Sequence, residues 1–128
     1  MKNFGKTIIP YDVSPEPHEL ETAKFFNKLG KDVTFIAPIY EKGAKTPDIK
    51  MDGLFWEIKA PKNKGKHTIE HAFRKALKQS KNIIFDLRRT KMPNDKCVSQ
   101  ITKQFALIRN VNRLLIITKD KRLIDLNG

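Results

Sequence analysis

The stretch TPDIKMDGLFWEIKAP, residues 46–61, places an Asp-Gly pair between two runs in which apolar residues alternate with polar ones. The pair Asp52-Gly53 predicts a two-residue type I′ turn, because that turn needs positive φ at both of its central positions. Such a turn fixes the register of the strands on either side and pairs residues 49–51 with residues 54–56. The stretch therefore predicts a tight β-hairpin.

Acidic and basic side chains come together at the open end of this hairpin. One step beyond the paired residues, the register sets Asp48 opposite Glu57, with β carbons about 5 Å apart on one side of the sheet. Because side chains alternate along a strand, Lys59 shares that side. Like charges this close destabilise a sheet unless a proton or a divalent cation lies between them. A solvated ion-pair cluster on a surface hairpin accounts for the same spacing, so the hairpin alone leaves both interpretations open.

Length and charge restrict the class of protein. The chain has 128 residues, enough for one domain with its own core, and its formal net charge is +12. A charge this positive indicates a polyanionic partner, with nucleic acid ahead of an anionic membrane surface. No apolar run reaches the ~18 residues needed to span a bilayer, and none resembles a signal-peptide core. The single cysteine, Cys97, excludes an internal disulfide and a cysteine-based zinc site.

The rest of the chain shows helical periods alternating with short apolar runs. Apolar strands separated by helices require a mixed sheet that is covered on both faces, which is an α/β fold. We expect a single domain over residues 1–128 that begins with an irregular lead-in over residues 1–16. The predicted helices span 17–29, 68–80 and 95–109, and the predicted strands outside the hairpin span 32–38, 82–87, 113–118 and 122–126.

One glutamate of the first predicted helix points toward the core. Glu19 falls near the middle of an apolar arc formed by Leu20, Ala23, Phe26 and Leu29. A carboxylate directed inward is costly unless it meets a partner. Stabilisation of the first helical turn by the helix dipole explains Glu19 without any site. The sharper interpretation makes it a third carboxylate beside Asp48 and Glu57.

Two motifs in this order resemble a known nuclease superfamily. Pro47-Asp48 before one strand and Glu57-Ile58-Lys59 on the next, after a helix with an inward glutamate, resemble the PD-(D/E)xK signature. More narrowly, HELETAKFFNKLGKDV, the hairpin stretch and IEHAFRKALKQSKNIIFDLRR resemble the tRNA nuclease domain at the C-terminal end of contact-dependent growth inhibition toxins. The resemblance implies a nuclease-like sandwich, with a mixed sheet between helices, and metal-dependent hydrolysis of phosphodiester bonds in tRNA.

The resemblance also implies roles for individual residues. Glu19, Asp48 and Glu57 correspond to metal-binding carboxylates, and Lys59 corresponds to the catalytic lysine. Mg²⁺ or Mn²⁺ is the expected cofactor, with Zn²⁺ less favoured, and a cognate immunity protein is the expected partner. The implied site of action is the cytoplasm, after delivery from outside as a toxin module.

Basic side chains are expected to supply most of the affinity for nucleic acid, through the release of counterions. Solubility alone explains about half of such residues in a chain this basic. The candidates are Lys62, Lys64, Lys66, Arg74, Lys75, Lys78, Arg88 and Arg89.

Three other functions fit parts of the same sequence. A metal-independent RNase would use His67, Thr68, His71, Arg74 and Lys59 as acid, base and phosphate-stabilising groups, since His67 and His71 share a helical face. A DNA endonuclease or junction resolvase of the same superfamily would use the same carboxylates. A non-catalytic basic module that binds nucleic acid would use none of them.

Overall fold

The computed structural model describes residues 3–38 and 46–127, which form a mixed sheet with helices on both faces. The seven strands lie across the sheet in the order of the sequence. No helix of this described part is long and apolar enough to cross a membrane. In chain order the elements are β1 (Thr7–Ile8), α1 (Pro17–Lys28), β2 (Val33–Phe35), β3 (Ile49–Met51), β4 (Leu54–Lys59), α2 (Thr68–Leu77), β5 (Asn82–Asp86), α3 (Asn94–Leu107), β6 (Arg113–Ile117) and β7 (Leu123–Asp125).

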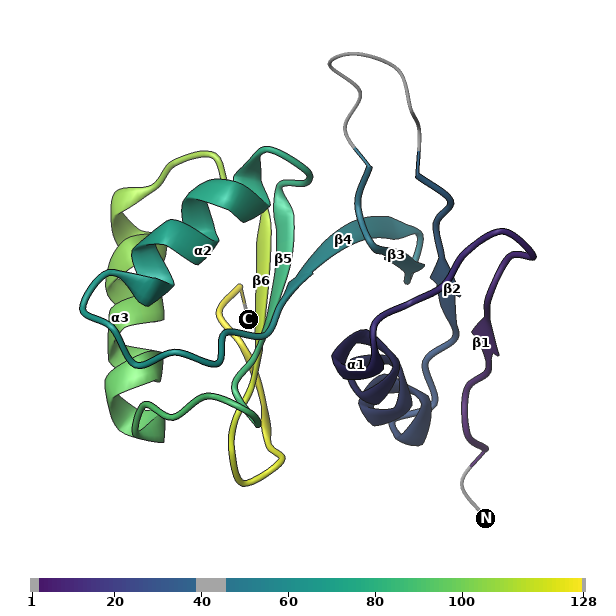
Figure 1. The fold of residues 1–128 in the computed structure, drawn as a ribbon, viewed down its shortest axis with the longest axis horizontal. Coiled ribbons are helices and arrows are strands. Elements are labelled where there is room, and N and C mark those ends of the chain that lie inside the picture. The colour runs from purple at the N-terminus through teal and green to yellow at the C-terminus, as the bar shows by residue number, and fades with distance from the viewer. Residues whose placement is uncertain (1–2, 39–45, 128) are drawn as a thin grey trace.

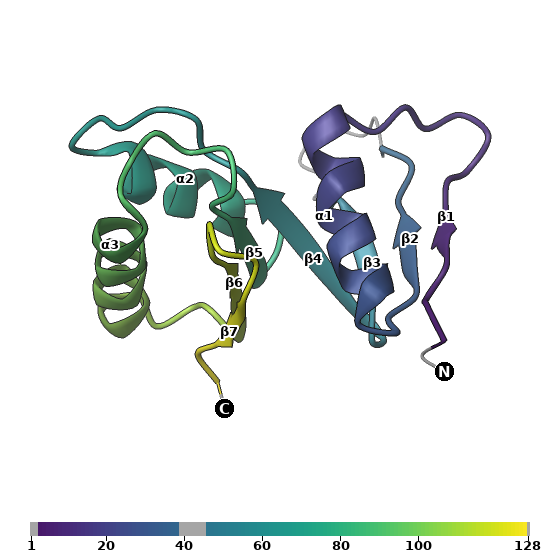
Figure 2. The ribbon, with the colours of Figure 1, turned by 90° about the horizontal axis from the view of Figure 1, so that it is seen from below.

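The α/β fold class predicted from the sequence is confirmed. Figures 1 and 2 show α1 on one side of the sheet and the pair α2 and α3 on the other. Neighbours in β5 point to opposite faces, so that Ile84 packs in the cluster under α1 while Ile83 and Phe85 pack under α2 and α3. β4 joins the two parts of the sheet, because it pairs antiparallel with β3 and parallel with β5.

The hairpin forms with the predicted turn and register. Asp52 and Gly53 both have positive φ, 55° and 75°, as a type I′ turn requires. Residues 49–51 pair with residues 54–56 as expected. The Trp56 indole N–H donates to the Met51 carbonyl oxygen at 3.0 Å, which secures the buried side of the turn.

Strand β1 lies inside the segment that was expected to be irregular. It pairs in parallel with β2, with Thr7 opposite Val33. The chain reaches this position through a close approach at Gly5, whose N–H donates to the Asn27 carbonyl oxygen at 2.7 Å. A Cβ at Gly5 would lie 1.8 Å from the Lys31 carbonyl oxygen, so only glycine fits there. A strand of two residues has no periodicity to detect, and tertiary pairing alone defines it.

Helix α1 presents a different face to the sheet from the predicted one. Ala23 and Phe26 are buried as expected, whereas Leu20 and Leu29 are exposed. The predicted arc was wrong because it extended to these two leucines and left out Thr22, a polar residue that is completely buried. The buried stripe therefore runs along Thr22, Ala23 and Phe26, between the two exposed leucines. The other predicted helices and strands are confirmed, with ends that move by at most three residues.

Candidate active site

Asp48 lies directly before β3 and its side chain reaches across to β4. Its N–H donates to the Trp56 carbonyl oxygen at 2.9 Å, and its Oδ2 accepts the Ile58 N–H at 2.7 Å. The ladder of paired residues ends at Ile49 and Trp56, so the predicted backbone pairing of Asp48 with Glu57 is not part of it. The carboxylate is nevertheless fixed beside β4, at the level of Glu57.

Glu57 is a buried carboxylate whose hydrogen bonding is incomplete. Its relative exposure is 6%, and its Oε2 lies 3.5 Å from the Lys59 ammonium nitrogen. Its other oxygen, Oε1, is buried and has no hydrogen-bond partner among the residues that the structure describes. Burial of this kind excludes the solvated surface cluster that the sequence left open. A buried carboxylate oxygen without a partner is costly, and it is a ready ligand for a cation or a donor group.

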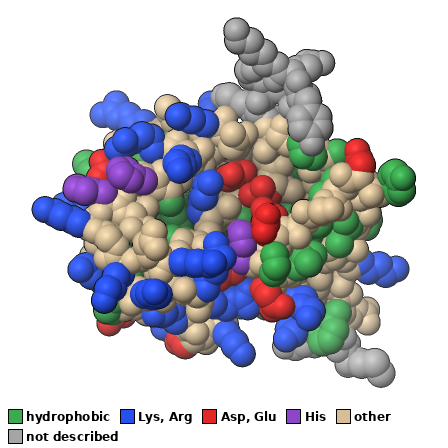
Figure 3. Space-filling model, viewed as in Figure 1, with side chains coloured by type: hydrophobic (Ala, Val, Ile, Leu, Met, Phe, Trp, Pro, Cys, Tyr) green, Lys and Arg blue, Asp and Glu red, His purple; other side chains and the backbone are tan. Residues whose placement is uncertain are grey.

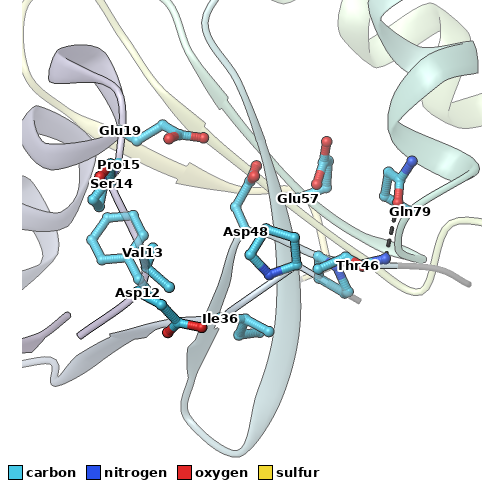
Figure 4. Close-up of a pocket in the computed structure, with 13 residues that line it drawn as sticks. Asp12, Val13, Ser14, Pro15, Glu19, Ile36, Thr46, Asp48, Glu57 and Gln79 are labelled. Carbon is cyan, nitrogen blue, oxygen red and sulfur yellow. Dashed lines mark hydrogen bonds between the residues drawn. The ribbon is translucent and has the colours of Figure 1, made fainter. Parts of the chain in front are cut away.

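Glu19 stabilises the first turn of α1 and also faces the site. Its Oε1 accepts the Glu16 N–H at 2.8 Å, which satisfies one of the free donors at the start of the helix. Figure 4 shows its carboxylate directed from α1 toward Asp48, whose own carboxylate lies on the same side of the hairpin as that of Glu57. The two interpretations of Glu19 from the sequence are thus compatible.

Burial raises the pKa of all three carboxyl groups. Burial raises the pKa of Asp48 to about 6, with the charge of Glu57 as the next cause. Burial also raises the pKa of Glu57, against the lowering effect of the Lys59 charge. Burial is again the main cause of the raised pKa of Glu19, and the Asp48 charge adds to it. Such clustered, raised pKa values are typical of functional sites.

Two hollows meet at these carboxylates. The larger, about 710 Å³, contains Glu19, Asp48, Glu57 and Asp12 together with uncharged residues such as Val13, and no Lys or Arg is among the described residues that line it. Figure 4 shows Gln79 at its margin, where its side-chain oxygen accepts the Thr46 N–H at 3.0 Å. The smaller hollow, about 340 Å³, contains the same three carboxylates and adds Lys59, Arg89 and His18.

Basic side chains are concentrated on one side of the three carboxylates. Figure 3 shows acidic side chains in the middle of the face, with Lys and Arg side chains crowded over the half that carries α2 and α3. Of the eight predicted contacts for nucleic acid, seven have exposed side chains: Lys62, Lys64, Lys66, Arg74, Lys75, Lys78 and Arg89. Arg74 forms an ion pair with Glu70 at 3.1 Å.

Arg88 differs from the other seven because it is engaged inside the fold. Its guanidinium donates to both oxygens of Asp86, at 2.9 and 2.7 Å, and to the Glu21 carbonyl oxygen of α1 at 3.0 Å. The Thr22 hydroxyl also donates to Asp86, at 2.6 Å. This network ties α1 to the end of β5 and was not expected from the sequence.

The histidines of the metal-independent alternative lie away from the carboxylates. His67 and His71 are exposed, stack on each other with ring centroids 6.1 Å apart, and flank Glu70. His67, Thr68, His71 and Arg74 line neither of the two hollows that contain Glu57. The histidine that does line the smaller hollow is His18, which the sequence did not single out although it directly precedes Glu19. Burial and the nearby Arg89 charge lower the pKa of His18.

Carboxylate oxygens are the type of ligand that a hard divalent cation prefers. Within the described residues, no three His, Cys, Asp or Glu side chains are placed so that together they could hold a metal ion, and this includes the predicted set of Glu19, Asp48 and Glu57. Mg²⁺ does not need three, because it is usually held by one or two carboxylates and keeps water for its other positions. Asp48 and Glu57 supply two carboxylates, and the unpaired Glu57 Oε1 is an oxygen donor that a cation would satisfy.

Comparison with known proteins places the chain in a family. Residues 45–123, more than half of the chain, match the family described as the contact-dependent growth inhibition CdiA C-terminal domain. The chain belongs to this family. No curated protein matches it.

A solved structure shares the fold along almost the whole chain. It is a CdiA-CT/CdiI toxin and immunity complex from Burkholderia pseudomallei, with a TM-score of 0.65 and 18% sequence identity. The alignment covers 95% of this chain and 96% of that one. At this identity the likeness establishes the fold.

Proposed function

We propose that this domain is a metal-dependent toxin nuclease of the PD-(D/E)xK type that cleaves RNA, with tRNA as its substrate. The observation that carries the proposal is the buried, incompletely bonded Glu57 beside Asp48 and Lys59 at the junction of two hollows. Membership of the CdiA C-terminal domain family supports a toxic role. The surplus of basic side chains supports a polyanionic substrate.

Asp48 and Glu57 would hold a Mg²⁺ or Mn²⁺ ion, with Glu19 beside them. The bound ion supplies a more acidic water and a positive charge at the phosphate. Lys59 places its ammonium group at the wall of the smaller hollow, where it offers charge and hydrogen bonds to a phosphate oxygen as negative charge develops. The Ile58 N–H holds the Asp48 carboxylate in a fixed orientation through a 2.7 Å hydrogen bond. Burial of this centre limits the access of bulk water and strengthens these electrostatic interactions.

An immunity protein and delivery into a target cell complete the proposed role. The structurally similar toxin from Burkholderia pseudomallei was solved in complex with an immunity protein. We propose that a cognate immunity protein binds this domain as well, and that the domain acts in the cytoplasm of the target cell.

The decisive experiment incubates the purified protein with total tRNA and with plasmid DNA, each with Mg²⁺, with Mn²⁺ or with EDTA. We expect tRNA cleavage that requires the metal, and loss of at least about a hundredfold in rate for Glu57→Gln and for Lys59→Ala, because each removes a charge at the reacting phosphate. Glu70→Gln is the matched control, since it removes an exposed carboxylate outside both hollows.

Each alternative predicts a different outcome of this experiment. Full cleavage in EDTA would point to the metal-independent route. Cleavage of plasmid DNA without cleavage of tRNA would make the domain a DNA endonuclease. The absence of cleavage under every condition, or unchanged rates in both variants, would leave a basic nucleic-acid-binding module.

A further inference from the structure

Two neighbouring arginines at the end of β5 have opposite environments. Arg88 is bound by Asp86 and by α1, as described above. Arg89 is exposed and has no ion pair with any of the residues that the structure describes. Its Nε donates to the Ala60 carbonyl oxygen, which orients the guanidinium. The sequence Arg88-Arg89 alone does not distinguish the two residues.

The hydrogen bond to the Ala60 carbonyl oxygen places Arg89 beside the proposed catalytic residues. Ala60 directly follows Lys59, so Arg89 is fixed to the end of β4 next to the proposed catalytic lysine. Arg89 lines the smaller hollow together with Glu19, Asp48 and Glu57. It also lines a third hollow, of about 410 Å³, that continues past Pro17 and Glu21.

These two hollows share His18, Ala60 and Arg89. Together they form a passage that leads away from the carboxylates and carries the positive charge of Arg89. The described residues that line the large hollow, on the other side of the carboxylates, include Asp12 and no Lys or Arg. A phosphate that follows the scissile one along the strand therefore meets the positive charge of Arg89 on this side of the carboxylates. A preoriented guanidinium can bind phosphate oxygens through two parallel hydrogen bonds.

We propose that Arg89 binds the backbone phosphate adjacent to the scissile one, so that the substrate strand leaves the centre through the passage lined by His18, Ala60 and Arg89. This inference rests on the proposed nuclease function and specifies the path by which the substrate strand leaves the site. In this arrangement Arg88 maintains the fold and Arg89 contacts the substrate.

Binding without metal tests the subsite independently of cleavage. The probe is a short fluorescein-labelled single-stranded RNA, titrated by fluorescence anisotropy in EDTA at several salt concentrations. We expect Arg89→Gln to bind about tenfold more weakly, which is about 1.4 kcal/mol, because the variant loses a charge-assisted hydrogen bond to the phosphate. Its slope of log affinity against log salt should fall by about 0.7, the value for one phosphate contact on a single strand.

Two further variants separate a subsite from a general loss of charge. Lys103→Gln removes a charge from an exposed position of α3, outside the three hollows, and should change affinity by less than about twofold. Arg89→Lys keeps the charge and loses the bond to Ala60, so it should restore the salt slope and only part of the affinity. Equal losses in Arg89→Gln and Lys103→Gln, or wild-type binding by Arg89→Gln, would overturn the inference.

The position of the phosphate is tested on an RNA that contains the mapped cut site. Replacing the phosphate next to that site by a neutral methylphosphonate should weaken binding of the wild type and leave Arg89→Gln unaffected. Equal effects on both proteins would overturn the inference while the nuclease function stands. If the wild type cleaves no nucleic acid, the function fails, and the titrations in EDTA still report the phosphate contact.

Discussion

At the scale of single residues, the negative charge that Asp48 needs to bind a metal ion lowers the stability of the metal-free protein. Burial and the Glu57 charge raise its pKa to about 6, which means that the folded protein binds a proton at Asp48 more tightly than the unfolded chain does. The stability that this proton contributes is complete below about pH 4, the ordinary range of the group. It is lost as the pH rises through about 6. Without metal, the free energy of unfolding should therefore decrease over this interval.

Asp48→Asn should separate these two effects of the charge. The amide keeps an oxygen that accepts the Ile58 N–H and carries no charge against Glu57. We expect the metal-free variant to be more stable than the wild type at pH 7.5 by on the order of 1–2 kcal/mol, with no Mg²⁺-dependent cleavage.

Thermal unfolding at pH 4.5 and pH 7.5, with and without Mn²⁺, measures both effects. Mn²⁺ should raise the melting temperature of the wild type at pH 7.5 and should leave that of Asp48→Asn unchanged. A variant that is less stable than the wild type at pH 7.5 without metal would contradict the electrostatic account.

At the scale of elements, a buried polar network holds α1 in place against the sheet. Asp86 is 4% exposed and accepts hydrogen bonds from Thr22 and Arg88. Burial acts to raise the pKa of Asp86, but the hydrogen bonds from Arg88 and Thr22 outweigh it and hold the pKa below its ordinary value. The stability from this network is present above about pH 4 and is lost on acidification. This pH dependence is opposite in sign to that of Asp48.

Thr22 tests the network with two matched variants. Thr22→Val keeps the shape of the side chain and removes the hydroxyl, so Asp86 loses a hydrogen bond and the protein should lose about 2 kcal/mol. Thr22→Ser keeps the hydroxyl and loses one methyl group, which should cost about 0.8 kcal/mol. Urea unfolding at pH 7 measures both values. A smaller loss for Thr22→Val than for Thr22→Ser would show that packing, and not this hydrogen bond, fixes the helix.

The same residue shows where sequence reasoning succeeds and where it stops. The Asp52-Gly53 turn was predictable because its backbone conformation restricts the residue types, and the hairpin followed from it. Burial of Thr22 was not predictable, because its partner Asp86 is 64 residues away in sequence. The position of the Glu19 carboxylate near Asp48 was predicted from helix geometry and from the family resemblance together. His18 and the different environments of Arg88 and Arg89 depend on tertiary contacts that no local pattern encodes.

At the scale of the whole molecule, the net charge of +12 should dominate the binding of RNA. If about half of the eight predicted basic residues contact phosphates, the slope of log affinity against log salt is about −3 for a single strand. Affinity should then fall roughly sixtyfold between about 50 and 200 mM salt. Anisotropy titrations of the wild type measure this slope, and a slope near zero would exclude binding through the backbone.

The two hydrophobic clusters divide the chain almost at its midpoint. The cluster under α2 and α3 is built entirely from residues after Lys66, and the cluster under α1 takes only Ile84, Leu115 and Ile117 from that part. All four proposed catalytic side chains lie between Glu19 and Lys59, whereas Arg89 belongs to the later half. Genetic recombination within residues 60–67 would therefore exchange the half of the chain that carries Arg89. The four proposed catalytic side chains would stay together in the other half. Besides Ile84, Leu115 and Ile117, the contacts of Asp86 and Arg88 with α1 would have to remain compatible.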